Sequence, residues 1–187
     1  MTVLQRLILE VPAWVPRIAV PGIYPGDVER MRVAVALARE NVVSRTGGPF
    51  GAAIFERASG RLVAGGVNLV LPMKNSVLHA EVVAIMLAEA ALQSFTLGVE
   101  SGAEHELVTS CEPCAMCLGA IHWSGVTRLV TGATKEDVEG IQFEEGPVFR
   151  ESYQYLEKRG MTIRTAVMRA EAKAVLQLYA TMNGEIY

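Results

Sequence analysis

Apolar residues follow helical spacing in some segments of the chain and form short strand-like runs in others. Apolar positions between Asp27 and about Ser44 recur at helical spacing, and they predict a helix that Asp27 caps. Residues 52–56 and 61–67 are short apolar runs separated by Ala-Ser-Gly, a pattern typical of a β-hairpin. Residues 79–92 are rich in Ala, Val, Leu, Met and Glu and lack Gly and Pro, so they predict a second helix.

The second half of the chain continues this alternation. Residues 106–109 predict a short strand, and Pro113 is suited to be the first residue of a helix that continues to about Ser124. Further along, the pattern predicts a strand at 127–131, a helix at 148–158, a strand at 161–165 and a last helix ending near Met182. This order predicts a three-layer α/β/α fold around a central mixed five-stranded sheet, because the hairpin is antiparallel and the crossovers are parallel.

Composition and charge limit the class of protein. The chain has 187 residues, of which 51% are hydrophobic and 20% charged, and this suits one globular domain. The formal net charge of −3 lacks the basic excess of a nucleic-acid binder. No apolar run is long enough to cross a bilayer, and the N-terminus lacks the pattern of a signal peptide. We expect a cytoplasmic protein without a nucleic-acid or membrane partner.

The N-terminal segment differs from the rest of the chain. Residues 4–20 are apolar, but three charged residues interrupt them, and Pro12, Pro16 and Pro21 prevent a continuous helix. We expect an extended arm that packs on the domain surface or on a second subunit. The predicted organisation is therefore an N-terminal extension over 1–26 and one domain over 27–187.

Two short motifs carry the candidate chemistry. Residues 79–81 read His-Ala-Glu, and residues 113–117 read Pro-Cys-Ala-Met-Cys. A zinc ion held by His79, Cys114 and Cys117 has three protein ligands and one open position for water, which is the ligand count of a catalytic site. In zinc-dependent base deaminases, a carboxylate placed like Glu81 is not a ligand and transfers protons instead. Both motifs fall at predicted helix starts, where the helix dipole favours thiolate over thiol.

Each of these residues also has a simpler interpretation. H-x-E or C-x-x-C alone often arises by chance, but here the two motifs occur together, in order and with a strand between them. Cys111 offers a second C-x-x-C register with Cys114, although Pro113 favours the pair Cys114 and Cys117; we interpret Cys111 as a buried residue at a strand end. We expect His105 in an exposed loop and His122 at a surface or an interface.

Three segments resemble the cytidine deaminase-like superfamily and, within it, the bacterial guanine deaminases. They are residues 109–123 (Thr-Ser-Cys-Glu-Pro-Cys-Ala-Met-Cys-Leu-Gly-Ala-Ile-His-Trp), 47–51 (Gly-Gly-Pro-Phe-Gly) and 79–82 (His-Ala-Glu-Val). The resemblance begins at about Asp27 and continues to the C-terminus. It implies one zinc ion per subunit, the cytidine deaminase-like fold and a purine base as substrate.

The resemblance also implies roles for individual residues. Asn68 and the backbone at Ala80 would orient the purine, and Phe50 and Trp123 would contact its ring. Glu145 would be a second proton-transfer group, although Glu144 is its neighbour and the family has aspartates at this pair. Tyr187 ends a tail that would close over the active site. In some members this tail comes from a swapped neighbouring subunit, which implies a homodimer.

The expected reaction is hydrolysis of guanine to xanthine and ammonia, with Glu81 and Glu145 transferring protons. Other substrates stay open: adenosine in transfer RNA, cytosine or a nucleoside, or an aminotriazine such as ammeline. The neutral-to-acidic charge disfavours transfer RNA. A non-catalytic zinc module usually has four protein ligands and leaves Glu81 unexplained. A thiol redox protein leaves the whole H-x-E motif unexplained.

Overall fold

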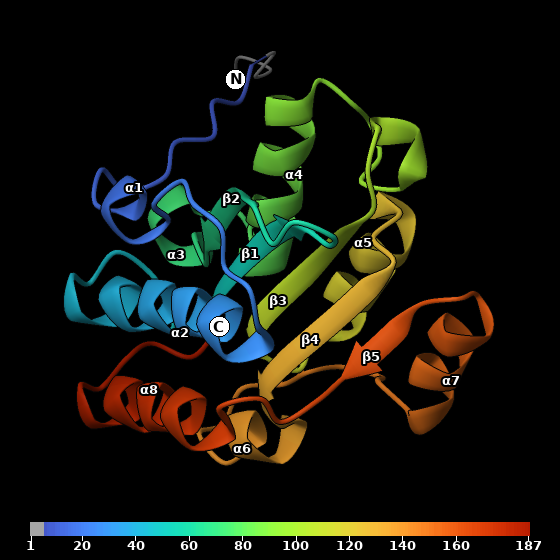
Figure 1. Ribbon diagram of the computed structural model, residues 1–187. Coiled ribbons are helices and arrows are strands. Elements are labelled where there is room, and N and C mark those ends of the chain that lie inside the picture. The colour runs from blue at the N-terminus through green and yellow to red at the C-terminus, as the bar shows by residue number, and fades with distance from the viewer. Residues whose placement is uncertain (1–5) are drawn as a thin grey trace.

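The computed structural model describes residues 6–187, and these form a five-stranded mixed sheet between two layers of helices (Figure 1). The strand order is β2-β1-β3-β4-β5. β1 is antiparallel to both β2 and β3, and β3, β4 and β5 are parallel to one another. The predicted three-layer α/β/α architecture is confirmed. The strands are Gly51–Glu56 (β1), Leu62–Val67 (β2), His105–Cys111 (β3), Arg128–Ala133 (β4) and Thr162–Arg164 (β5).

Each face of the sheet buries one group of helices. On one face, α2 and α8 contribute buried residues such as Leu37 and Leu176, and on the other α4 and α5 contribute Ala84 and Ile121. The helices are α1 (Val15–Ile18), α2 (Asp27–Val43), α3 (Val70–Met73), α4 (Ala80–Leu92), α5 (Ala115–Ser124), α6 (Lys135–Glu139), α7 (Arg150–Lys158) and α8 (Arg169–Thr181), with a short 3-10 helix at Val99–Ser101. None of the helices within residues 6–187 is long and apolar enough to cross a membrane.

One close contact seats α4 on the sheet. A Cβ atom on Gly66 of β2 would lie 2.4 Å from both Ala80 O and Ala84 N, so only glycine allows the helix backbone this near to the strand. The contact fixes the first turn of α4, which carries Glu81, against the sheet. The position of this turn matters because α4 begins directly after His79.

Two local expectations about the fold were wrong. Asp27 does not cap α2, because Gly26 occupies the N-cap position and the Asp27 carboxylate pairs with Arg128 and Arg164 instead. His105 is not in an exposed loop. It begins β3, is 1% exposed, and its Nδ1 lies 2.9 Å from Leu97 O. The strand begins one residue before and ends two residues after the predicted run 106–109, and polar neighbours in the sequence concealed this extension.

The N-terminal segment packs on its own chain. It contains the short helix α1, and Trp14 and Val15 are buried in the core beside α2. Residues 1–5, where the predicted arm begins, lie outside the described residues. The predicted boundary at residue 27 stays a prediction.

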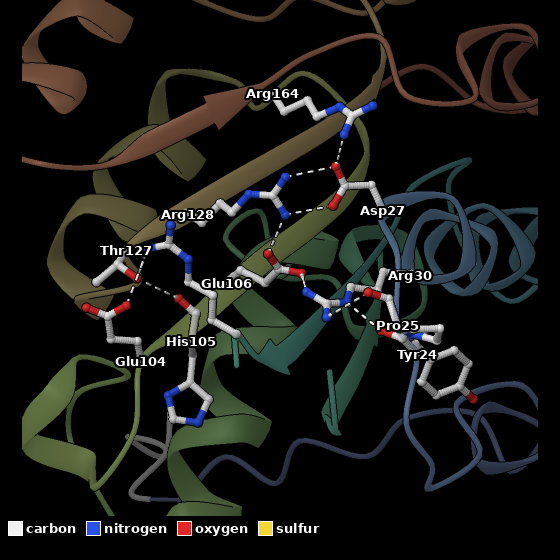
Figure 2. Close-up of polar contacts among 11 residues, drawn as sticks. Tyr24, Pro25, Asp27, Arg30, Glu104, His105, Glu106, Thr127, Arg128 and Arg164 are labelled. Atoms are coloured by element: carbon white, nitrogen blue, oxygen red, sulfur yellow. Dashed lines mark hydrogen bonds and ion pairs between the residues drawn. The ribbon is translucent and has the colours of Figure 1, made fainter. Parts of the chain in front are cut away.

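A network of charged side chains joins α2 to three strands at one end of the sheet (Figure 2). Glu106 is fully buried and accepts hydrogen bonds from Arg30 at 2.5 Å and from Arg128 at 2.6 Å. Arg128 also binds Asp27 at 2.7 Å, and Asp27 pairs in addition with Arg164. The network therefore connects the start of α2 with the amino ends of β3 and β4 and with Arg164, the last residue of β5.

Candidate active site

The three predicted zinc ligands meet where two helices begin. His79 is the N-cap of α4, Cys114 is the N-cap of α5, and Cys117 lies in the first turn of α5. Their ligand atoms all lie within 4.8 Å of one another, and His79 Nδ1 is 3.5 Å from Cys114 Sγ. Tetrahedral zinc with ordinary Zn–N and Zn–S bonds places such atoms about 3.5–3.8 Å apart. The donor set and its spacing therefore fit zinc.

Glu81 lies beside this ligand set. It is 6% exposed, and its two carboxylate oxygens accept hydrogen bonds from Thr109 Oγ1 at 3.2 Å and from Cys117 Sγ at 3.4 Å. Burial raises the pKa of Glu81 above its ordinary value. A buried carboxyl with a raised pKa beside a catalytic metal site is suited to accept and return a proton.

A small cavity opens above the ligands. Its volume is about 40 Å³, and His79, Glu81 and Cys114 line its floor. Three aromatic rings meet at its wall: Phe143 packs edge-on against Phe50 and against Tyr187, with ring centroids 5.1 Å apart in both pairs. The cavity therefore has polar and metal-binding side chains at its base and aromatic rings along its side, and this arrangement suits a flat heteroaromatic ring.

The C-terminal tail covers this cavity from the same chain. Tyr179 of α8 donates a hydrogen bond to Glu185 O at 2.6 Å, and Tyr187 lines the cavity. A Cβ atom on Gly48 would lie 2.0 Å from the Tyr187 hydroxyl, so the tail packs directly on the Gly-Gly-Pro-Phe-Gly segment. In this structure Tyr187 therefore reaches the active site of its own subunit.

Glu144 and Glu145 both line the cavity but differ in burial. Glu145 is 8% exposed, and its backbone oxygen accepts a hydrogen bond from Ala115 N at 3.0 Å, which fixes the loop to the start of α5. Glu144 is exposed. Burial raises the pKa of Glu145 to about 8. Of the two, Glu145 is therefore the one placed to hold a proton inside the site.

The raised pKa of Glu145 has a measurable consequence in the zinc-free protein. This carboxyl titrates near 4.5 when unfolded and near 8 when folded, so between these values the folded state binds more protons. The free energy of unfolding should therefore fall as pH rises through this interval, by at most about 5 kcal/mol. We expect urea unfolding at about pH 5 and about pH 9 to show this loss in the wild type and a smaller loss in Glu145→Gln. An equal loss in both proteins would show that Glu145 is not the group whose raised pKa causes this pH dependence.

Asn68 follows β2 directly and is fully buried. Its backbone N–H donates to Phe50 O at 3.1 Å, and its Oδ1 accepts a hydrogen bond from Val70 N at 3.2 Å. Among residues 6–187, no atom accepts a hydrogen bond from its Nδ2. Buried donors are rarely left unpaired in folded proteins, so the free Nδ2 of Asn68 is a candidate ligand contact, although Asn68 is not among the residues that line the cavity.

Not every predicted site residue is brought to the cavity. Trp123 is 82% exposed, and it lies nine residues beyond Cys114 on α5, about 13 Å along the helix. Trp123 is therefore not among the residues that line the cavity. Ala80 is fully buried at the first position of α4, where its N–H has no helical partner.

Two cavity residues escaped sequence reasoning. Phe143 reads as an ordinary core residue, and only the fold shows that it joins Phe50 to Tyr187. Glu112 also lines the cavity, and its Oε2 accepts a hydrogen bond from Lys135 N at 2.9 Å. Its position directly before the Pro-Cys-Ala-Met-Cys motif was the only available signal.

Three metal ligands with an unligated carboxylate beside them define a zinc-dependent hydrolytic deaminase. Residues 26–133 match the family described as the cytidine and deoxycytidylate deaminase zinc-binding region. This match spans more than half of the chain, and the chain belongs to that family.

Among curated proteins, the chain is similar to guanine deaminase of Bacillus subtilis (strain 168), with 36% identity over 69% of this chain and 78% of the relative. Among solved structures, it is similar to guanine deaminase from Nitrosomonas europaea, with 40% identity, a TM-score of 0.90, and coverage of 97% of this chain and 100% of that one. It is also similar to NE0047 in complex with 2,6-diaminopurine, with 42% identity, a TM-score of 0.90, and coverage of 96% and 95%.

Proposed function

We propose that this protein hydrolyses guanine to xanthine and ammonia. The main support is the placement of Glu81, which touches the zinc ligand Cys117 at 3.4 Å and faces a cavity with aromatic walls. The similarity to the guanine deaminase from Nitrosomonas europaea supports a purine, because it extends over 97% of this chain.

His79, Cys114 and Cys117 would hold one zinc ion per subunit. When bound, zinc supplies a Lewis acid that lowers the pKa of a coordinated water to about 7. Glu81 accepts a proton from the attacking water and passes it to N3 of guanine, which makes C2 electrophilic. The water oxygen adds to C2, and the bond from C2 to the amino nitrogen then breaks.

Glu145 is the second proton-transfer residue in this scheme. It is 8% exposed, and this burial favours the protonated form of the carboxyl, so it is suited to give a proton to the leaving amino group. As the C2–O bond becomes a carbonyl, Glu81 accepts the second proton of the water, and this proton replaces the one that Glu145 gave to the departing ammonia. Glu144 contacts the substrate from the exposed side of the cavity.

Four groups hold the ring in this proposal. Asn68 donates its free amide N–H to an acceptor on the purine, and the Ala80 backbone contributes the first-turn N–H of α4. Phe50 and Tyr187 border the ring and exclude water from the reaction. A cavity of about 40 Å³ is much smaller than ordinary ligand pockets, so the tail that carries Tyr187 has to move to admit the base.

We further propose a cytoplasmic homodimer that acts on a free base and not on nucleic acid. Residues 27–187 form its catalytic domain, and 1–26 are an extension. Trp123 is 82% exposed and lies beside His122, and the ring centroids of His122 and Tyr155 are 5.5 Å apart. This aromatic surface suits a contact between subunits. Sedimentation velocity should give a dimer, and a monomer at micromolar concentration would contradict it.

The decisive experiment is a panel of substrates assayed for ammonia release. Guanine, adenine, cytosine, cytidine, an aminotriazine and an adenosine-containing transfer RNA are each incubated with the zinc-loaded protein. We expect guanine to give the highest kcat/KM and xanthine to appear in equal amounts with ammonia. A higher kcat/KM for any other amine would replace guanine as the substrate, and no release from any would overturn the proposal.

A further inference from the structure

The N-terminal segment contacts the turn between α2 and β1 through a tryptophan. Trp14 is 7% exposed, and its indole N–H donates a hydrogen bond to Thr46 Oγ1 at 3.2 Å. Thr46 lies in the turn between α2 and β1, directly before Gly47 and Gly48. An indole N–H that finds a partner on burial is ordinary, but this partner is itself part of a longer chain of hydrogen bonds.

Thr46 also makes a hydrogen bond to Asn41. Its hydroxyl donates to Asn41 Oδ1 at 2.8 Å, so the same oxygen accepts from Trp14 and donates to Asn41. Asn41 is fully buried on α2, and its Nδ2 donates to Gly48 O and to Asn68 O, both at 2.9 Å. Two carbonyl oxygens can be bound only by the NH₂ end of the amide, so the direction of every bond in this chain is fixed.

Gly47 makes this approach possible. A Cβ atom there would lie 2.0 Å from Asn68 O and 2.6 Å from Asn41 Nδ2, which no side chain tolerates. The Gly-Gly segment thus lets the amide of Asn41 reach the backbone of Asn68. Together with Phe50 O and Val70 N, Asn41 fixes Asn68 at three points and leaves only its Nδ2 free.

We propose that Trp14, Thr46 and Asn41 form a positioning relay that holds Asn68 for the substrate. In this relay the N-terminal segment helps to determine how the ring is bound, although it lies more than 50 residues from Asn68 in the sequence. Binding groups lose effect when they are displaced by a fraction of an ångström, so buried supporting hydrogen bonds are part of a binding site. The inference rests on the proposed function, because Asn68 is assigned there to the purine.

The test measures kcat and KM for guanine in two matched variants of Thr46. Thr46→Val keeps the shape and removes the hydroxyl, whereas Thr46→Ser keeps the hydroxyl. We expect Thr46→Val to lower kcat/KM about tenfold, chiefly through a higher KM, because the chemistry at Glu81 is untouched. Thr46→Ser should restore most of the loss. Trp14→Phe should lower kcat/KM about threefold, since it removes only the outer hydrogen bond.

A double-mutant cycle separates positioning from a general effect on the fold. In an Asn68→Ala background, Thr46→Val should change kcat/KM less than about twofold, because the residue that it positions is already gone. Zinc content should stay at one per subunit in all variants. A full tenfold loss in the Asn68→Ala background, or a Thr46→Ser variant no better than Thr46→Val, would overturn the relay.

Failure of the proposed function is a different result. A zinc-loaded wild type that releases no ammonia from guanine would overturn the substrate, and the same cycle is then measured with the ring that the wild type does deaminate. If Thr46→Val does not fold, the Trp14→Phe variant in the two backgrounds gives the same comparison. Equal losses in both backgrounds would then overturn the relay.

Discussion

Glu81→Gln should leave zinc bound and lower kcat for guanine at least about 10³-fold. Glutamine keeps the size of the side chain and can still accept a hydrogen bond from Thr109, so the pocket should keep its shape. It cannot take up a proton from water or pass one to N3 of guanine. The measurement is ammonia release under saturating guanine, with zinc content determined on the same sample.

The matched control is Glu89→Gln on the same helix. Glu89 lies eight residues beyond Glu81, about 12 Å along α4, and is partly exposed. Its replacement should leave kcat within about twofold, since an exposed carboxylate away from the cavity contributes little. A Glu81→Gln variant with near-normal kcat and a full complement of zinc would remove Glu81 from the chemistry.

Segments with strong periodicity were predictable from the sequence because their pattern and their burial agree. The hairpin at 52–56 and 61–67 and the helices at 27–44 and 79–92 were all found within a few residues of their observed limits. The metal ligands were predictable for another reason. Zinc chemistry requires particular residue types at short spacings, so His79 and the Cys114–Cys117 pair are visible without any knowledge of the fold.

Residues whose role depends on distant partners were harder to predict. Phe143 becomes a wall of the site only because the tail brings Tyr187 to it, and Asp27 leaves its capping role because β4 brings Arg128 to it. Trp123 shows the opposite case. Its place in a motif implied a contact with the base, but it lies near the end of α5, whose first turn carries Cys117, and its side chain is exposed at the surface.

Glu106 also depends on partners that are distant in the sequence, Arg30 and Arg128, and its replacement should have a large effect on stability. Glu106→Gln should lower the free energy of unfolding by about 3–5 kcal/mol, because it leaves a buried positive charge without its counter-ion. Arg128 keeps its pair with Asp27, but Arg30, whose side chain is 7% exposed, keeps only backbone oxygens such as Tyr24 O at 2.7 Å (Figure 2). Urea unfolding of the zinc-loaded protein gives the difference, and the m-value should not change.

Glu104→Gln is the control for this prediction, because it removes a carboxylate two residues away that pairs with Arg57 at the surface. In that pair the side chains are 36% and 51% exposed, so the free energy of unfolding of the variant should fall by less than about 1 kcal/mol.

The kcat of Glu106→Gln separates an effect on stability from an effect on catalysis. The network lies at the amino ends of β3 and β4, and Cys111, at the other end of β3, leads into the Cys114–Cys117 motif. Glu106→Gln should therefore keep kcat within about threefold below its unfolding temperature, and a loss of stability below about 1 kcal/mol would contradict the role of a buried counter-ion.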